Sequence, residues 1–337
     1  MKKIKEGVVK WGVVGVGDVC EVKSAPAMQL IEHSELVAVM RRDGNKARDY
    51  AERHKVPLWF DDADQLIHHP EVNAIYIATP PAAHAQYAIK AAKVGKPVYV
   101  EKPMARSTRE CQQMIDACSK VGIPLYVAYY RRRLPNFEKL KSLLEQGAIG
   151  AMRSVKIELL QAPDPDIVAK GSDWRVDPKI AGGGYFFDLA SHQLDYLDYA
   201  LGPIESVTGH ATNQANLYAA ADQVQALFQW PGGLCGMGQW CFTVDPKAAK
   251  DEMVIMGSEG SIKMSFFGPP VIYLERSDRT EPEIFQFEMP KHIQQPLIQT
   301  VVDDLMGQGS CPSTGETAIR TNSIMEQITG NYYRDDS

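Results

Sequence analysis

The chain has 337 residues, of which 45% are hydrophobic and 23% charged, a composition typical of a globular protein with room for two domain cores. Its 36 basic and 42 acidic residues give a formal net charge of −6, which argues against a nucleic acid or a membrane surface as the partner. The six cysteines form no CxxC pair and no stretch of 18 apolar residues occurs, so we expect a cytoplasmic protein with free thiols.

Short apolar segments alternate with helical ones over the first third of the chain. A short strand joined by a helix to the next strand needs a right-handed crossover, and this builds a parallel sheet with helices on both faces. The sequence therefore predicts an α/β domain of the Rossmann type over residues 1–126. The expected strands are 8–16, 36–40, 73–79 and 97–100, and the expected helices are 46–54, 82–94 and 108–121.

The pattern then changes to strands separated by turns rich in proline and glycine. It predicts that residues 127–337 form an α+β domain with a large, mainly antiparallel open sheet. Because one face of such a sheet stays uncovered, we expect a homodimer or homotetramer formed through it. The expected strands are 125–130, 154–160, 204–210, 223–229, 234–242, 252–256, 261–267 and 271–276, and the expected helices are 136–146, 185–201, 296–306 and 317–329.

A glycine-rich turn follows the first expected strand. Gly15 and Gly17 stand where that strand meets a helix, and glycine permits both the tight turn and the close approach of a pyrophosphate. Cys20, in place of a third glycine, is small enough to keep helix and strand close. A turn with no ligand is the alternative, but the order strand, turn, helix favours a dinucleotide site that Asp18 and Val19 adjoin.

The end of the second strand discriminates between the two nicotinamide cofactors. An NAD site places an acidic residue there to hold the ribose 2′-hydroxyl, whereas arginine suits a 2′-phosphate. This sequence has Arg41 and Arg42, and an acid follows only at Asp43. A solvated basic loop is the alternative. The arginines favour NADP(H) over NAD(H).

Two further strand ends are expected at the same edge of the parallel sheet. Thr79 and Pro80 end one strand, and Glu101, Lys102 and Pro103 end the next. A lysine there can donate a hydrogen bond to a substrate oxygen, and a nearby nicotinamide cation would lower its pKa towards proton exchange. The alternative is an ordinary surface lysine. The position of Lys102 between a glutamate and a rigid proline argues against this alternative.

The segment 174–192 combines three glycines with an acid and a histidine. Asp188 and His192 are spaced i and i+4, so they project from one face of a helix that begins near Tyr185. A carboxylate and an imidazole together can hold a hydroxyl group and move its proton. A helix N-terminus with an incidental aspartate and a surface histidine is the alternative.

These motifs together resemble the glucose-fructose oxidoreductase/inositol dehydrogenase family (Gfo/Idh/MocA). The resemblance rests on their order along nearly the whole chain: Gly15-x-Gly17, Thr79-Pro80-Pro81-x-x-His84, Glu101-Lys102-Pro103, Trp174-Arg175, Gly182-Gly183-Gly184 and Asp188-x-x-x-His192. It implies a Rossmann domain followed by an α/β domain whose open sheet makes the oligomer interface. It also implies NAD(P)-dependent oxidation or reduction of a sugar, a polyol or a related carbonyl compound.

Site residues follow from the resemblance, position by position. Lys102, Asp188 and His192 match the family's catalytic residues. The cofactor-binding candidates are Gly15, Gly17, Asp18, Val19, Arg41, Arg42, Thr79, Pro80, His84, Glu101, Lys102, Trp174 and Arg175. The substrate-binding candidates are Lys102, Tyr130, Arg175, Asp188 and His192. Cys20 and Arg41 depart from the family pattern, and the second of these puts NAD preference in doubt.

The expected chemistry is reversible hydride transfer between nicotinamide and a secondary alcohol or carbonyl carbon. His192 would move the hydroxyl proton, Lys102 would polarise the same oxygen and Asp188 would orient substrate or imidazole. The lysine and the histidine could also exchange these roles.

Two other functions remain open. One is an NAD-dependent glycosidase with a transient redox cycle, against which the arginines argue. The other is a catalytically silent nucleotide sensor, which would need no acid–base pair. No metal site is expected, because the only adjacent histidines, His68 and His69, would face different ways.

Overall fold

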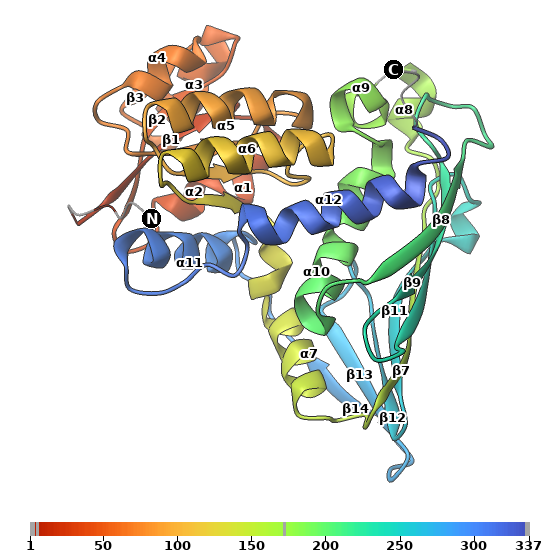
Figure 1. Cartoon of the computed structure of the whole chain (residues 1–337). Coiled ribbons are helices and arrows are strands. Elements are labelled where there is room, and N and C mark those ends of the chain that lie inside the picture. The colour runs from red at the N-terminus through yellow and green to blue at the C-terminus, as the bar shows by residue number, and fades with distance from the viewer. Residues whose placement is uncertain (1–3, 5–6, 171–172, 334–337) are drawn as a thin grey trace. The chain divides into compact units, whose positions relative to one another are not determined.

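The computed structural model describes residues 4, 7–170 and 173–333 (Figure 1). The chain divides into two compact units. The first comprises residues 1–133 together with Pro290–Ile319, and the second comprises Leu134–Met289 together with residues 320–337. The first unit thus extends past the expected boundary at residue 126, and it takes up a C-terminal segment that the sequence analysis placed in the second domain.

The first unit contains a six-stranded sheet in the order β3-β2-β1-β4-β5-β6, and every pair in it is parallel. The order reverses between β1 and β4, which is the point where doubly wound sheets bind ligands. The predicted α/β class is confirmed. The strands are β1 (Val9–Val14), β2 (Ser34–Met40), β3 (Leu58–Phe60), β4 (Ala74–Ile77), β5 (Val98–Val100) and β6 (Leu125–Val127).

Helices pack on this sheet through alanine and β-branched residues. Ala88 and Ala91 of α5 and Met114 of α6 are fully buried in one apolar cluster with Ile75 and Val98 of the sheet. The helices are α1 (Asp18–Val22), α2 (Ala25–Met28), α3 (Gly44–His54), α4 (Ala63–His68), α5 (His84–Lys93), α6 (Thr108–Lys120) and α11 (Gln295–Met306), with short 3₁₀ turns η1 (Pro81–Ala83) and η2 (Tyr130–Arg133).

The second unit contains an eight-stranded sheet in the order β14-β13-β12-β11-β7-β10-β9-β8. All its pairs are antiparallel except β7 with β10, so the predicted mainly antiparallel sheet is confirmed. The strands are β7 (Met152–Leu160), β8 (Ser206–Thr212), β9 (Gln223–Gln229), β10 (Cys235–Cys241), β11 (Lys250–Gly257), β12 (Gly260–Met264), β13 (Val271–Arg276) and β14 (Glu283–Gln286).

The helices of the second unit are more irregular than the sequence predicts. The expected helix 185–201 is a π-helical segment, η4 (Phe186–Ala190), followed by α10 (Ser191–Leu201). The other helices are α7 (Pro135–Glu145), α8 (Pro165–Lys170), η3 (Trp174–Val176), α9 (Pro178–Ala181) and η5 (Pro246–Ala248), and α12 (Gly315–Thr329) begins in the first unit and ends in the second. Figure 1 shows α7 and α10 on the same side of the sheet.

Some elements end earlier than predicted, or were not predicted. The strand expected over 261–267 stops at Met264, because the Asp251 carboxylate accepts hydrogen bonds from the amides of Phe266, Phe267 and Gly268 and turns the chain away. Strands β3 and β14 have only three and four residues, too few to show a period in the sequence.

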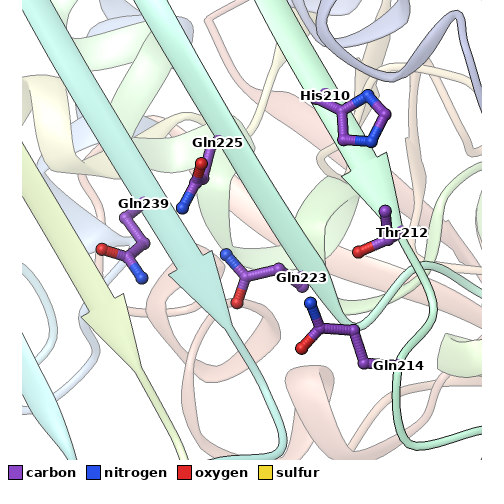
Figure 2. A pocket seen from close by; sticks show the side chains of 6 residues that line it. All are labelled: His210, Thr212, Gln214, Gln223, Gln225 and Gln239. Carbon is purple, nitrogen blue, oxygen red and sulfur yellow. The ribbon is translucent and has the colours of Figure 1, made fainter.

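The outer face of the second sheet is polar with scattered apolar groups. Along β9, Val224, Ala226 and Phe228 are buried, whereas Leu227 is 60% exposed on the opposite face. Amide side chains gather on that exposed face around a shallow hollow of about 450 Å³ (Figure 2). The hollow is lined by His210, Thr212, Gln214, Gln223, Gln225 and Gln239.

A chain of ion pairs crosses the same outer face. Glu158 pairs with Lys156 and Lys250, and Glu252 pairs with Lys250 and Lys263, with N–O distances between 2.6 and 3.0 Å. These hydrogen bonds from lysines hold the pKa of both glutamates below the ordinary value.

Within the described residues, no helix combines the length and the apolar character needed to cross a membrane.

Candidate active site

The predicted site residues fall into both units. The first unit holds Gly15, Gly17, Asp18, Val19, Arg41, Arg42, Thr79, Pro80, His84, Glu101, Lys102 and Tyr130, and the second holds Trp174, Arg175, Asp188 and His192.

The glycine-rich turn joins the ends of three neighbouring strands. Gly15 has φ +94°, and a Cβ atom built on it would lie 2.6 Å from Cγ2 of Thr79, so only glycine fits there. The amides of Gly15 and Val16 donate to the Met40 carbonyl oxygen at 2.9 and 3.1 Å. By contrast, a Cβ atom on Gly17 would meet nothing closer than 4.0 Å, which leaves room for a ligand over the turn.

Thr79 gives a second sign of a ligand at this edge of the sheet. Its hydroxyl oxygen is buried and has no hydrogen-bond partner among the described residues. A buried hydroxyl without a partner is costly, and a bound ligand would satisfy it. The open turn at Gly17 and the orphaned hydroxyl at Thr79 both fit a dinucleotide.

Cys20 takes the third glycine position of the motif as a packing residue. Its side chain is fully buried, and burial raises the pKa of the thiol to about 12. Its carbonyl oxygen accepts a hydrogen bond of 2.7 Å from the Tyr50 hydroxyl, which fastens α1 to α3. The thiol therefore stays protonated and serves packing.

Two arginines directly follow β2, and the acid after them caps a helix. Arg41 donates from Nη1 to the Val16 carbonyl oxygen at 3.3 Å, so its guanidinium lies beside the glycine-rich turn. Asp43 caps α3, and its carboxylate accepts hydrogen bonds from the amides of Asn45 and Lys46. The acid that follows the arginines is thus occupied by the helix, and Arg42 is exposed.

Lys102 follows β5, which pairs with β4, the strand that Thr79 follows. The Lys102 amide donates to Oε2 of Glu101 at 3.2 Å, and the Lys102–Pro103 peptide is cis. Glu101 is itself buried, and its Oε1 accepts hydrogen bonds of 2.5 Å from the Tyr76 hydroxyl and 2.7 Å from Nε2 of Gln294. The backbone at the lysine is therefore held by a buried carboxylate.

His84 holds the loop on the other side of Lys102. The ring is fully buried, with Nε2 2.7 Å from the Thr79 carbonyl oxygen and Nδ1 3.1 and 3.2 Å from those of Pro103 and Met104. Burial lowers the pKa of the imidazole, although these carbonyl groups oppose the shift. Both ring nitrogens face the backbone, so His84 shapes the site from behind.

Tyr130 and the arginines after it lie just beyond β6. Tyr130 is buried, with the Arg131 guanidinium 5.6 Å from its ring centroid. Arg132 is also buried and donates to the carbonyl oxygen of Pro312 and to Oγ1 of Thr317. Arg132 thereby ties the C-terminal segment to the parallel sheet.

In the second unit, the three glycines form a turn that no other residue could make. Gly182 and Gly184 have φ +91° and +66°. A Cβ atom on Gly183 would lie 2.1 Å from the Phe187 ring, and one on Gly184 would lie 2.4 Å from Cβ of Ala220. The sequence indicated room for an approaching ligand, but these two glycines make room for the protein's own side chains.

Asp188 and His192 follow that turn on two different kinds of helix. Asp188 lies in the π-helical segment η4 and is half-buried, whereas His192 lies in the first turn of α10 and is 3% exposed. π-helical turns occur frequently at functional sites. The His192 ring lies 6.2 Å from that of Phe267 in an edge-on arrangement.

Charged side chains of the second unit act on one tyrosine that the sequence analysis did not single out as a site residue. Burial raises the pKa of Tyr185 to about 12, with smaller contributions from the carboxylates of Asp164, Asp173 and Asp188. The Arg175 guanidinium acts in the opposite direction. Arg175 and Asp188, both predicted site residues, thus act in opposite directions on the pKa of the same phenol.

Trp174 and Arg175 form a compact pair in η3. Asp173 caps this turn by accepting from the Arg175 amide at 2.8 Å, and its carboxylate pairs with the guanidinium at 3.3 Å. The guanidinium lies 4.6 Å from the Trp174 ring centroid, a cation–π contact. The pair therefore presents an aromatic and a cationic surface together.

Comparison with known proteins accords with this geometry. Residues 9–129 match the oxidoreductase family with an NAD-binding Rossmann fold, and residues 137–263 match the GFO/IDH/MocA C-terminal domain. The chain is 37% identical over 326 residues to Oxidoreductase P35 of Formosa agariphila, which covers 96% of this chain and 99% of that protein.

Two solved structures share the fold. Levoglucosan dehydrogenase in complex with NADH and levoglucosan has a TM-score of 0.86 at 22% identity and covers 98% of both chains. KijD10, a 3-ketoreductase from Actinomadura kijaniata in complex with NADP, has a TM-score of 0.82 at 20% identity and covers 96% of this chain and 98% of that one.

The fold and the dinucleotide turn define an NAD(P)-dependent oxidoreductase. The chain belongs to the GFO/IDH/MocA family.

Proposed function

We propose that this enzyme transfers a hydride reversibly between NADP(H) and a secondary alcohol or carbonyl carbon of a sugar or polyol. The observation that carries the proposal is the edge of the parallel sheet, where an open glycine turn, the orphaned Thr79 hydroxyl and the rigidly held Lys102 backbone follow neighbouring strands. Levoglucosan dehydrogenase and the 3-ketoreductase, which share the fold, support a sugar as the substrate.

The residues of this chain would divide the work by their chemistry. The nicotinamide, when bound, supplies the carbon that gives or accepts the hydride. The turn at Gly17 would lie against its pyrophosphate. The Lys102 ammonium would donate a hydrogen bond to the substrate oxygen, and the His192 imidazole would take up or return the hydroxyl proton. Asp188 would orient the substrate or that imidazole.

NADP(H) is the proposed cofactor because of the end of β2. Arg41 lies beside the glycine turn, and guanidinium groups bind phosphate in a bidentate manner. Asp43, the acid that follows the two arginines in the sequence, caps α3 instead. Both features support a 2′-phosphate at this place.

We further propose that two or four copies associate through the outer face of the second sheet. This face exposes Leu227, Met237 and Tyr273, at 60%, 49% and 39%. Large apolar side chains on one open sheet face support burial against a second copy. A cytoplasmic location is proposed with it, because all six cysteines are free and five of them are buried.

A substrate screen tests the function. Sugars, inositols and keto-sugars are offered with NADPH and NADH, and nicotinamide absorbance is followed together with release of the aglycone from glycosides. Net change of absorbance with NADPH is the expected result. Glycoside cleavage without net change would identify a glycosidase instead, and cofactor binding without either would identify a sensor.

A further inference from the structure

Gln294 is a buried residue that no sequence motif marks. It precedes α11 in the C-terminal segment that packs with the parallel sheet, and its side chain is fully buried. Its Nε2 donates to Oε1 of Glu101 at 2.7 Å, and its Oε1 accepts from the Tyr99 hydroxyl at 3.0 Å. Both ends of the amide are therefore satisfied inside the unit.

The surrounding groups fix which way this amide points. The Tyr99 hydroxyl donates to Oε1, so Nε2 is left to face the carboxylate. Tyr99 stacks on Tyr76 with ring centroids 5.0 Å apart, and the Tyr76 hydroxyl donates to the same Oε1 of Glu101. A side chain that both donates and accepts is required at position 294, and glutamine provides this without a charge.

The network ends at the lysine. Oε2, the second oxygen of the Glu101 carboxylate, accepts from the Lys102 amide. If Glu101 rotated away from Gln294 and Tyr76, its hydrogen bond with the Lys102 amide would be lost, whereas the contacts of His84 with the Pro103 and Met104 carbonyl groups would remain. The orientation of the lysine backbone therefore depends on position 294.

The same turn also contacts the helix of the glycine motif. The backbone N–H of Gln294 donates to the Lys23 carbonyl oxygen at 3.1 Å. Nδ1 of His292 lies 2.6 Å from the Val22 carbonyl oxygen at the end of α1. One turn of the C-terminal segment thus joins the helix that follows the glycine turn to β5, the strand that Lys102 follows.

We propose that Gln294 is a positioning residue, which sets the place of the Lys102 ammonium by holding the Glu101 carboxylate. The inference rests on the proposed function, in which Lys102 acts on the substrate oxygen. It assigns the C-terminal segment a part in catalysis although Gln294 itself reaches no reacting atom. Small displacements of a catalytic group are costly, about 10²-fold in rate for 1 Å.

Two substitutions and one control test this role. Gln294→Leu removes both hydrogen bonds at similar volume, and we expect kcat to fall by about 10- to 100-fold with the NADPH dissociation constant little changed. Gln294→Glu places a second carboxylate against Glu101, and the pair will share one proton. We therefore expect kcat of this variant to be retained at low pH and lost as pH rises. Gln299→Leu, which loses only a contact with Asp303 on α11, should behave as wild type.

A spectroscopic measurement separates this inference from the proposed function. Methylation of lysines with isotopically labelled formaldehyde gives an NMR signal for Lys102, identified by its absence in Lys102→Arg. We expect that signal to shift in Gln294→Leu and not in Gln299→Leu, whether or not a substrate is known. An unmoved signal would overturn the inference. Unchanged kcat in both Gln294 variants would do the same, because a purely structural role would lower only the melting temperature.

Discussion

Nε2 of His84 lies 2.7 Å from the carbonyl oxygen of Thr79, and this one contact connects two predicted site residues in a way the sequence did not indicate. The motif suggested that the histidine binds the cofactor. Instead the buried ring joins the ends of β4 and β5 through three backbone carbonyl groups. The lysine that follows β5 gains rigidity from a residue that presents no polar ring atom to a ligand.

Replacing His84 should therefore cost stability as well as activity. In His84→Leu the buried carbonyl oxygens of Thr79, Pro103 and Met104 lose the ring N–H that one side of the imidazole supplies, and a buried polar group without a partner costs about 1–3 kcal/mol. We expect a loss of this size in the free energy of unfolding, measured by urea titration, and a lower kcat. His68→Leu, at an exposed position at the end of α4, is the matched control and should unfold as wild type does.

The same ring should make stability depend on pH. Burial lowers the pKa of His84 from its ordinary value of 6.5, so below that pH the unfolded chain binds a proton that the folded chain resists. The contribution of the neutral ring is complete above pH 6.5 and decreases as pH falls below it. Urea titrations at a series of pH values should show this decline in the wild type and a smaller one in His84→Gln. Equal slopes in the two proteins would count against the buried neutral ring.

The glycine turn of the second unit allows steric overlap to be separated from backbone strain. Gly183→Ala would drive a methyl group into the Phe187 ring, and overpacking of this kind typically costs about 1–3 kcal/mol. Gly184→Ala adds the strain of a positive φ to a clash with Ala220 and should cost more. Gly232→Ala has a similar φ of +85° but nothing within 4 Å, so it measures strain alone. If all three variants lost the same stability, packing would not explain the first two.

Arg41 should determine the choice between cofactors. Loss of a charge-assisted hydrogen bond to phosphate costs about 1.5–3 kcal/mol, or roughly 10- to 100-fold in affinity. Arg41→Ala should weaken NADPH binding by this factor and leave NADH binding nearly unchanged, as measured by nicotinamide fluorescence. Asp43→Asn keeps a side chain that can cap α3 and serves as the control. Equal weakening of both cofactors by Arg41→Ala would point to a general effect on the turn.

Features that depend on neighbouring residues in the chain could be predicted from the sequence, whereas contacts between distant residues could not. Gly15 and Gly17 were recognisable because a strand, a turn and a helix follow one another in the chain. Gln294 was not, because the group that it binds lies at Glu101, 193 residues away. A buried polar side chain also gives no period in a single sequence. The return of Pro290–Ile319 to the first unit is a long-range feature of the same kind.

The π-helical turn at Phe186–Ala190 was missed for a different reason. Its apolar spacing suits an ordinary α-helix, and the wider turn follows the tight glycine turn in which Gly183 packs under Phe187. The spacing of Asp188 and His192 was visible in the sequence, but the two kinds of helix that carry them were not.

The roles of Lys102 and His192 can be distinguished by their effects on rate and pH. Loss of a general acid or base typically costs about 10²–10⁴-fold in rate. His192→Ala and Lys102→Met should each lower kcat within that range, and NADPH binding should stay nearly intact in His192→Ala. The variant that has lost the proton acceptor should also lose the limb of the pH–rate profile that reports its ionisation. If the acidic limb disappears in His192→Ala and persists in Lys102→Met, the imidazole moves the proton and the ammonium polarises the oxygen. The reverse result would exchange the two roles, and wild-type turnover in His192→Ala would exclude the histidine from the reaction.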